Sequence, residues 1–207
     1  MEGYQEIKIL DINLSDETVE ERILSKEIIN LYPDGSAFGM YLLLQEMDSG
    51  ADPLSSSNLL IFTYNNRNAA KKPEEQLVIT TKSPLNASVG DSKVESFFPY
   101  VLKKYGLYAM IFRGKAKKPV YFYMNSSHYE IRDAHAIWGK VTGESERIIK
   151  EQLQENELEM AQIGPAGENM IKYSCIITMT NRANGRSGTG AVMGSKNLKA
   201  IVLSKTK

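Results

Sequence analysis

The most informative stretch of the chain is Asn181-Arg-Ala-Asn-Gly-Arg-Ser-Gly-Thr-Gly-Ala-Val-Met-Gly-Ser-Lys-Asn-Leu-Lys199. It holds four glycines within ten residues, at positions 185, 188, 190 and 194. Glycine lets a backbone approach a ligand closely, and successive amides in such a loop can form a nest that binds anions. Positive charge surrounds the glycines, from Arg182, Arg186, Lys196 and Lys199. This pattern predicts a loop suited to phosphate or pyrophosphate.

The glycine spacing fits neither of two common phosphate-binding motifs. Gly188-x-Gly190-x-x-x-Gly194 is one residue too long for the dinucleotide fingerprint, and the chain has no Gly-Lys-Ser/Thr of a P-loop. The same residues also suit a glycine-rich turn that packs against the last strand and exposes its cations. Spacing alone leaves both interpretations open.

Other candidate segments carry weaker signals. Lys82 follows a predicted strand in Thr80-Thr-Lys-Ser-Pro-Leu85 and could orient an anion, although a solvated lysine is the commoner case. His128 and His135 lack a third ligand, so we expect no metal site there. Cys175, the single cysteine, excludes an intrachain disulfide and a four-thiolate cluster built from this chain alone, and its apolar neighbours favour an inert buried thiol. We identify no catalytic residues.

Composition limits the class of protein. The 207 residues suit one domain spanning residues 1–207, and 42% of them are hydrophobic. Lys plus Arg and Asp plus Glu number 25 each, which argues against a nucleic-acid binder. No apolar run is long enough for a membrane helix, and the first residues do not resemble a signal peptide. We therefore expect a cytoplasmic protein that binds neither nucleic acid nor membrane.

The apolar patterning predicts an α+β fold with mostly antiparallel strands and short helices. Residues 5–24 alternate between apolar and polar side chains and should form an opening hairpin. Residues 65–75 are polar and basic and should form an exposed loop. We expect Trp138 in the core. The expected helices are 26–32, 37–47, 94–105 and 144–154, and the expected later strands are 59–64, 77–81, 109–113, 120–124, 129–133, 159–163, 173–179 and 200–203.

Six motifs in order along the chain resemble the N-terminal domain of the aldehyde ferredoxin oxidoreductase family. The last is the stretch from Gly185 to Ile201. The other five are Thr81-Lys-Ser-Pro-Leu85, Gly114-Lys-Ala-Lys-Lys-Pro-Val-Tyr121, Glu130-Ile-Arg-Asp-Ala134, Ile137-Trp-Gly-Lys140 and Ile163-Gly-Pro-Ala-Gly-Glu-Asn169. The resemblance extends over nearly the whole chain. It implies a base of two sheets related by an approximate twofold.

The resemblance also implies a chemistry. Enzymes of the family occur in anaerobes, oxidise aldehydes to carboxylic acids and pass the electrons to ferredoxin. They use a tungsten or molybdenum bis-pyranopterin (molybdopterin) with magnesium and a 4Fe-4S cluster. Two helical domains that follow the N-terminal domain supply the cluster cysteines and much of the substrate pocket. Because those segments are missing from this sequence, we expect no cofactor in the isolated chain, and a protein partner carrying the missing domains or self-association.

Carried over by motif, the resemblance implies that Arg182 is a pterin-proximal arginine and that Ala183 is a magnesium-bridging alanine. Further cofactor-binding candidates come from the glycine-rich loop and the strand end, and they are Gly185, Arg186, Gly188 and Lys82. Three family positions are altered. Gln76 stands where the family has a pterin-contacting arginine, Lys93 where it has an asparagine that helps bind magnesium, and Glu95 where it has a glycine. An ammonium has no lone pair for Mg²⁺, and a carboxylate repels pterin phosphates. Further departures fall at Asp34-Gly-Ser-Ala37 and Asn65-Asn-Arg-Asn-Ala69.

These alterations indicate a degenerate cofactor site, and they leave three functional hypotheses. The first is a stand-alone, catalytically incomplete relative that acts as a binding or assembly subunit. The second is the cofactor-binding part of a split tungsten or molybdenum aldehyde oxidoreductase. The third is a phosphate or nucleotide binding module that uses the glycine-rich loop.

Overall fold

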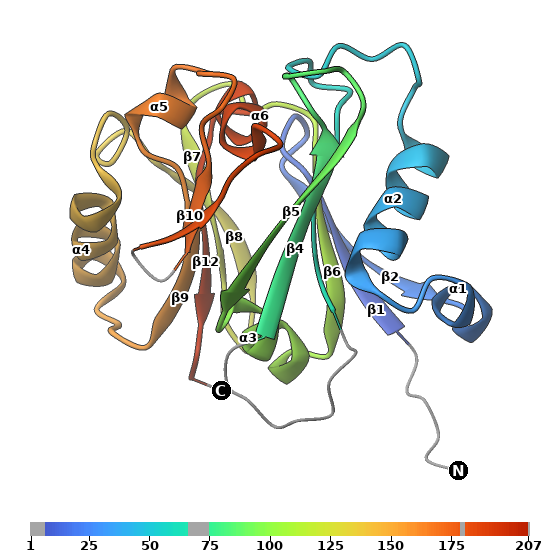
Figure 1. Cartoon of the computed structure of the whole chain (residues 1–207). Coiled ribbons are helices and arrows are strands. Elements are labelled where there is room, and N and C mark those ends of the chain that lie inside the picture. Colours follow the sequence, from blue (N-terminus) through green and yellow to red (C-terminus); the bar gives the residue numbers. More distant parts are fainter. Residues whose placement is uncertain (1–6, 66–74, 179–180, 207) are drawn as a thin grey trace.

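The computed structural model describes residues 7–65, 75–178 and 181–206, which form two six-stranded β-sheets with short helices around them (Figure 1). The first sheet has the strand order β2-β1-β6-β3-β4-β5 and the second has the order β11-β10-β9-β12-β7-β8. Two pairings are parallel, β1 with β6 and β12 with β7, and the other pairings between described strands are antiparallel. The expected α+β fold with mostly antiparallel strands is therefore confirmed.

The element bounds follow the chain in order. The strands are β1 Ile7–Asn13, β2 Thr18–Leu24, β3 Leu60–Tyr64, β4 Glu75–Lys82, β5 Val89–Ser96, β6 Leu107–Arg113, β7 Val120–Met124, β8 Tyr129–Asp133, β9 Leu158–Gln162, β10 Ile176–Thr178, β11 Arg182–Asn184 and β12 Leu198–Ser204. The helices are α1 Lys26–Leu31, α2 Gly35–Glu46, α3 Phe98–Lys104, α4 Thr142–Leu153, α5 Pro165–Glu168 and α6 Thr189–Ser195.

The two halves of the chain repeat one strand topology. When the second sheet is listed from β8, its order is β8-β7-β12-β9-β10-β11, which is the first sheet's order with six added to each strand number. The parallel pairing occurs at the same place in both sheets, and each parallel pair has a register shift near its start. The twofold-related sheets implied by the family resemblance therefore have a direct counterpart in the strand connectivity.

The main apolar core lies between the sheets. Phe112 of β6 meets Phe122 of β7 edge to face, with ring centroids 5.6 Å apart. Phe62 of β3, the strand beside β6 in the first sheet, also packs against Phe112. All three side chains are fully buried, and burial of one such side chain stabilises a fold by roughly 1.5–3 kcal/mol. The outer faces are covered by helices, α2 on the first sheet and α4 on the second (Figure 1).

The opening hairpin is confirmed, because β1 and β2 pair antiparallel from Ile7 opposite Leu24 to Asn13 opposite Thr18. The predicted helix 94–105 is wrong in its first part, since residues 89–96 form the edge strand β5 and the helix covers only Phe98–Lys104. Inward positions of β5 include Ser92 and Ser96, so the strand lacks the apolar alternation that would have identified it.

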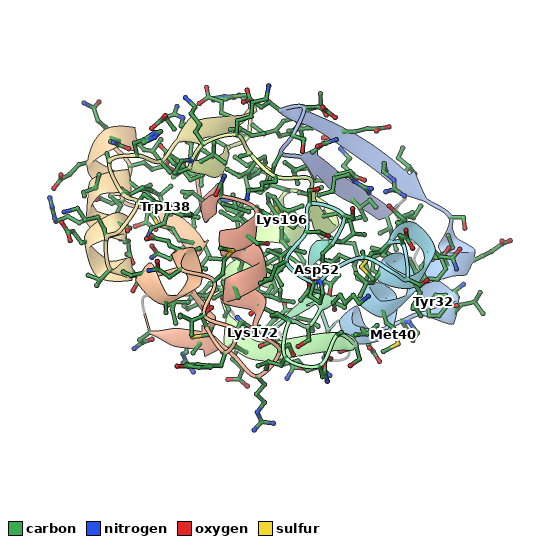
Figure 2. The ribbon with its side chains drawn as sticks, turned by 90° about the horizontal axis from the view of Figure 1, so that it is seen from above. Tyr32, Met40, Asp52, Trp138, Lys172 and Lys196 are labelled. Atoms are coloured by element: carbon green, nitrogen blue, oxygen red, sulfur yellow. The ribbon has the colours of Figure 1, made fainter. Side chains whose placement is uncertain are left out.

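Three smaller expectations have mixed outcomes. Trp138 is half-buried near α4 rather than in the core (Figure 2). The predicted loop at residues 65–75 lies almost entirely outside the described residues. Among the described residues, no helix is both long and apolar enough to cross a membrane.

Candidate functional site

The glycine-rich segment runs from β11 through a turn into α6. Asn184 ends β11, and its backbone carbonyl accepts a hydrogen bond of 2.9 Å from the Thr189 hydroxyl. α6 is buried, including both of its glycines, Gly190 and Gly194. This placement explains why the sequence supported two interpretations, because one end of the segment packs inside the protein and the other reaches the surface.

The packing end consists of Gly188, Gly190 and Gly194. Gly188 has a φ of +66°, and a Cβ there would lie 2.2 Å from the Lys172 carbonyl oxygen. A Cβ at Gly190 or Gly194 would lie 2.6 Å or 1.9 Å from a backbone carbonyl oxygen. The sequence placed Gly188 among cofactor-binding residues, whereas the structure packs it against Lys172 and Pro84. The turn interpretation therefore holds for this end of the segment.

The surface end lines a hollow where the two sheets meet. This seam hollow has a volume of about 490 Å³ and is lined by Asp91, Ser92, Lys93, Ala183, Gly185 and Arg186. Its walls come from β5 of the first sheet and from β11 and the following turn of the second, which are equivalent strands in the repeated topology. The Ser187 hydroxyl donates to the Asp91 carbonyl oxygen at 2.8 Å and joins the two walls.

Three residues predicted from the glycine-rich segment thus come together with one altered position. Ala183 and Arg186 are exposed, Gly185 is half-buried, and Lys93 faces them from β5. A Cβ at Gly185 would meet nothing closer than the Cβ of Cys175 at 3.8 Å, so this glycine leaves open space beside the hollow. Cys175 itself is half-buried, which corrects the expectation of a fully buried thiol.

Asp91, Lys93 and Glu95 are exposed and form a charged row along one face of the edge strand β5. Lys93 Nζ lies 3.1 Å from Asp91 Oδ2, with both side chains about 40% exposed. Glu95, the next residue on that face, pairs across the ladder with Gln76 of β4. Gln76 accepts a hydrogen bond from Asn65. The altered positions Gln76, Lys93 and Glu95 are therefore neighbours in space, although only Lys93 lines the seam hollow.

Arg182 is half-buried in β11 beside Ala183 and is not among the residues that line the seam hollow, and the other three predicted cations lie elsewhere. The Lys82 ammonium donates to the Ser49 carbonyl oxygen at 2.7 Å and does not line the seam hollow. Lys196 and Lys199 are fully buried, which contradicts the expectation that they surround the loop with positive charge. Figure 2 places Lys196 near the middle of the molecule, whereas Lys172 lies toward its rim.

Lys196 and Lys199 are held by groups that only the folded chain assembles. Lys196 Nζ donates to the carbonyl oxygens of Asn58 at 2.5 Å and Gly114 at 3.0 Å. Burial lowers the pKa of Lys196 to about 7, and the charge of Arg113 adds to the effect. Lys199 forms a buried ion pair with Glu168 and donates to the Lys140 carbonyl oxygen at 2.8 Å. Burial lowers the pKa of Lys199, while Glu168 opposes the shift.

A second hollow, also of about 490 Å³, lies among β1, β2, β6 and the β7–β8 turn. Its polar lining includes Lys8, Glu21 and His128, and it contains none of the predicted site residues. The described residues hold no group of three His, Cys, Asp or Glu side chains placed to bind a metal ion. His135 pairs with Asp133 at 3.0 Å instead.

The seam hollow fits one part of the family cofactor better than another. Lys93, Arg186 and the open side of Gly185 suit an anionic, phosphate-bearing group. Side-chain ligands for a bridging Mg²⁺ fit poorly, because Lys93 presents an ammonium and pairs with Asp91. The one cysteine of the chain cannot hold a 4Fe-4S cluster.

Comparison with known proteins agrees with the motif resemblance. The curated relatives include the tungsten-containing aldehyde ferredoxin oxidoreductase of Pyrococcus horikoshii, 43% identical over 197 residues that make up 95% of this chain and 32% of that protein. The aliphatic sulfonate oxidoreductase, WOR-like subunit, of Pyrococcus furiosus is 34% identical over 94% of this chain and 34% of its own length. The chain thus spans about a third of the length of these relatives.

A solved structure gives the same result. The active site complex BamBC of benzoyl coenzyme A reductase, in complex with 1,5-dienoyl-CoA, superposes with a TM-score of 0.90 and 33% identity. The match covers 97% of this chain and 31% of that one. The family model of the aldehyde ferredoxin oxidoreductase N-terminal domain matches residues 9–205. Sequence and fold agree, and the chain belongs to the aldehyde ferredoxin oxidoreductase family through this N-terminal domain.

Proposed function

We propose that the chain is the cofactor-holding base of an oxidoreductase, acting as a binding subunit that needs further protein for catalysis. The observation that carries the proposal is the seam hollow, whose walls join Lys93 of one sheet to Ala183, Gly185 and Arg186 of the other. Two positions that the family resemblance links to magnesium, Lys93 and Ala183, meet there with two candidates from the glycine-rich loop, and the two walls are about 90 residues apart in the chain. A packed turn alone would not require that convergence.

In this role the hollow holds the phosphate-bearing end of a pterin cofactor. The Arg186 guanidinium and the Lys93 ammonium offer charge-assisted hydrogen bonds to phosphate oxygens. Gly185 leaves room for the ligand close to the backbone. A tungsten- or molybdenum-pterin group, when bound, supplies the redox chemistry, whereas the residues of this chain bind and orient it.

The need for further protein is supported by size and by surface. Relatives of the chain are about three times its length, so two-thirds of each lies beyond the matched region. The turn holding Pro84 and the segment holding Lys172 both adjoin Gly188, and each presents an exposed apolar side chain next to that contact. Leu85 is 49% exposed and Tyr173 is 77% exposed. We expect a partner protein to cover these two side chains, because both lie beside the same contact.

A fluorescence titration with a pterin phosphate tests the proposal. We expect binding that Arg186→Gln weakens, because the variant removes a guanidinium from the hollow. Arg147→Gln is the matched control, since Arg147 is an exposed arginine on α4 outside the hollow. Equal affinity in the Arg186→Gln variant would contradict the proposal. Tight binding of nucleotides without pterin binding would instead favour a nucleotide module.

Metal analysis of the isolated chain provides a second test. We expect neither tungsten, molybdenum nor an iron–sulfur cluster, because one cysteine cannot hold a cluster and the side chains that line the hollow suit a phosphate group better than a metal ion. We expect pterin and metal to be retained when the chain is co-expressed with a partner protein that completes the site. Stoichiometric tungsten or molybdenum in the isolated chain would contradict the requirement for a partner.

A further inference from the structure

The second hollow, among β1, β2, β6 and the β7–β8 turn, shares no lining residue with the seam hollow. Its walls also come from both sheets, with the β1–β2 hairpin on one side and the β7–β8 hairpin on the other. The Tyr129 hydroxyl donates to Glu21 Oε1 at 3.2 Å and joins the two walls. The volume of about 490 Å³ is within the range of sites that hold small molecules.

Part of the lining of the second hollow is apolar. Leu107 of β6 and Met124 of β7 line it with exposed fractions of only 3% and 2%, so they lie at its base. Tyr105 is half-buried and Tyr129 is exposed, and each contributes an aromatic ring to the lining. Aromatic rings pack well against another ring. A planar apolar group that enters the hollow is therefore removed from water by these four side chains.

The second hollow also contains an ion pair. Lys8 Nζ lies 2.7 Å from Glu21 Oε2, with side chains 37% and 42% exposed. An ammonium has three donor hydrogens, and a carboxylate can accept about four hydrogen bonds. The contact between Lys8 and Glu21 and the hydrogen bond from Tyr129 leave both groups with capacity for another partner. A ligand can therefore bind both charges without separating the pair.

The balance of charge in the second hollow indicates the kind of ligand. Lys8 and Glu21 cancel each other, and His128, also in the lining, has its Nε2 3.2 Å from Glu130 Oε1. A ligand with a single charge is attracted by one member of the Lys8–Glu21 pair and repelled by the other. A zwitterion places its carboxylate beside the ammonium and its ammonium beside the carboxylate, so that all four charges are balanced.

We infer that the second hollow binds a small zwitterion with an aromatic side chain, the chemical class of an aromatic α-amino acid. The aromatic group lies against Leu107 and Met124, the ligand carboxylate beside Lys8 and the ligand ammonium beside Glu21. Because this hollow is separate from the seam hollow, the inference adds a binding site that does not depend on the proposed function.

A two-dimensional NMR titration of the chain with phenylalanine tests the inference. Three analogues each remove one part of the ligand: phenylpropanoate lacks the ammonium, phenethylamine lacks the carboxylate, and glycine lacks the aromatic side chain. The variants Lys8→Gln and Glu21→Gln each remove one charge of the pair. The matched controls are Lys140→Gln and Glu144→Gln, which alter an exposed lysine–glutamate pair of 2.8 Å outside the hollow. Thermal unfolding verifies that all four variants fold.

We expect phenylalanine to shift the amide resonances of Lys8, Glu21 and His128 and to saturate in the millimolar range. Loss of either charged group of the ligand should weaken binding about two- to fivefold, because the protein charges are exposed. Loss of the aromatic group should weaken binding by about tenfold, because it removes the buried apolar surface.

The two hollow variants should discriminate between the analogues. Lys8→Gln should weaken the binding of phenylalanine and phenylpropanoate without weakening that of phenethylamine. Glu21→Gln should weaken the binding of phenylalanine and phenethylamine without weakening that of phenylpropanoate. The control variants should match the wild type.

Three results would each overturn the inference. The first is the absence of phenylalanine-induced shift changes at the hollow. The second is an analogue that binds as tightly as phenylalanine. The third is a loss of affinity in the control variants as large as that in Lys8→Gln and Glu21→Gln, because it would show a general charge effect. None of these results bears on phosphate binding at the seam hollow.

Discussion

Lys199 and Glu168 form an ion pair inside the protein, with side chains 0% and 4% exposed. Glu168 also accepts a hydrogen bond of 2.7 Å from the Gly139 amide, and Lys199 donates to the Lys140 carbonyl oxygen. Three of the motifs that mark the family, around positions 139, 168 and 199, are therefore joined by one buried contact. Lys199 and Glu168 therefore have a structural role in these motifs, because their contact holds the turn at Gly139, α5 and β12 together.

Breaking this pair should destabilise the protein strongly. We expect Glu168→Gln to lower the free energy of unfolding by about 3–5 kcal/mol, because it leaves the Lys199 charge buried without its partner. Glu151→Gln, which breaks the exposed Arg147–Glu151 pair, should cost less than about 1 kcal/mol. Urea unfolding of both variants measures the difference, and similar losses in the two variants would contradict the structural role of Glu168.

Lys196 should make stability depend on pH. Its pKa is about 7 in the folded protein and near its ordinary value in the unfolded chain, so between these values the unfolded chain binds more protons. Stability should then rise with pH from about 7 toward 10, by up to about 1.4 kcal/mol per unit from this group. Below pH 7 Lys196 is protonated in the folded protein as well, so the full cost of burying its charge lowers the free energy of unfolding.

Lys196→Met isolates that effect, because other titrating groups are unchanged. The difference in unfolding free energy between wild type and variant should increase from pH 7 to pH 9.5 in favour of the wild type. A difference that is constant across this range would show that Lys196 stays protonated against its two carbonyl acceptors.

Substitution by alanine should affect stability at one glycine of the segment and ligand binding at another. Gly194→Ala should cost about 1–3 kcal/mol or more of stability, because the new Cβ would lie 1.9 Å from the Gly167 carbonyl oxygen. Gly185→Ala should leave stability nearly unchanged, because the new Cβ would lie 3.8 Å from its nearest neighbour, the Cβ of Cys175. It should weaken pyrophosphate binding, because the added methyl group narrows the hollow. Thermal unfolding and calorimetry test the pair, and a Gly185→Ala variant with unchanged affinity would count against close backbone approach.

Glu159 offers a test of the core. It is 3% exposed, and burial raises its pKa despite the nearby Lys205 and Ser96. The folded protein therefore binds this proton more tightly than the unfolded chain does, and stability is lost as the pH rises above the ordinary glutamate value. Glu159→Gln should raise the melting temperature at pH 7 and have less effect at pH 4. A lower melting temperature at pH 7 would mean that the contact with Lys205 outweighs burial.

Much of the fold could be predicted from the sequence, and the failures have physical causes. The hairpin of β1 and β2 follows from simple alternation. The strand β5 was missed because its inward residues include Ser92 and Ser96, which bury hydroxyls where a strand usually buries apolar groups. Lys196 was misplaced because its carbonyl acceptors, at Asn58 and Gly114, are distant in the chain and meet it only after folding.

The candidate site was predictable in part. Ala183, Gly185 and Arg186 came from the glycine-rich segment and the family resemblance, and the structure places all three in one hollow. Asp91 was missed, although its position two residues before Lys93 would have placed both on one strand face. Recognising it required knowing that residues 89–96 form a strand, which is the element the sequence did not identify.

A two-dimensional NMR titration of the chain with pyrophosphate in EDTA shows whether the seam hollow is the phosphate-binding site. We expect the amide shift changes to concentrate at Lys93, Ala183 and Gly185, on both walls of the seam hollow. Changes that concentrate instead around Lys8 and His128 at the other hollow, or that appear on neither wall, would contradict this expectation.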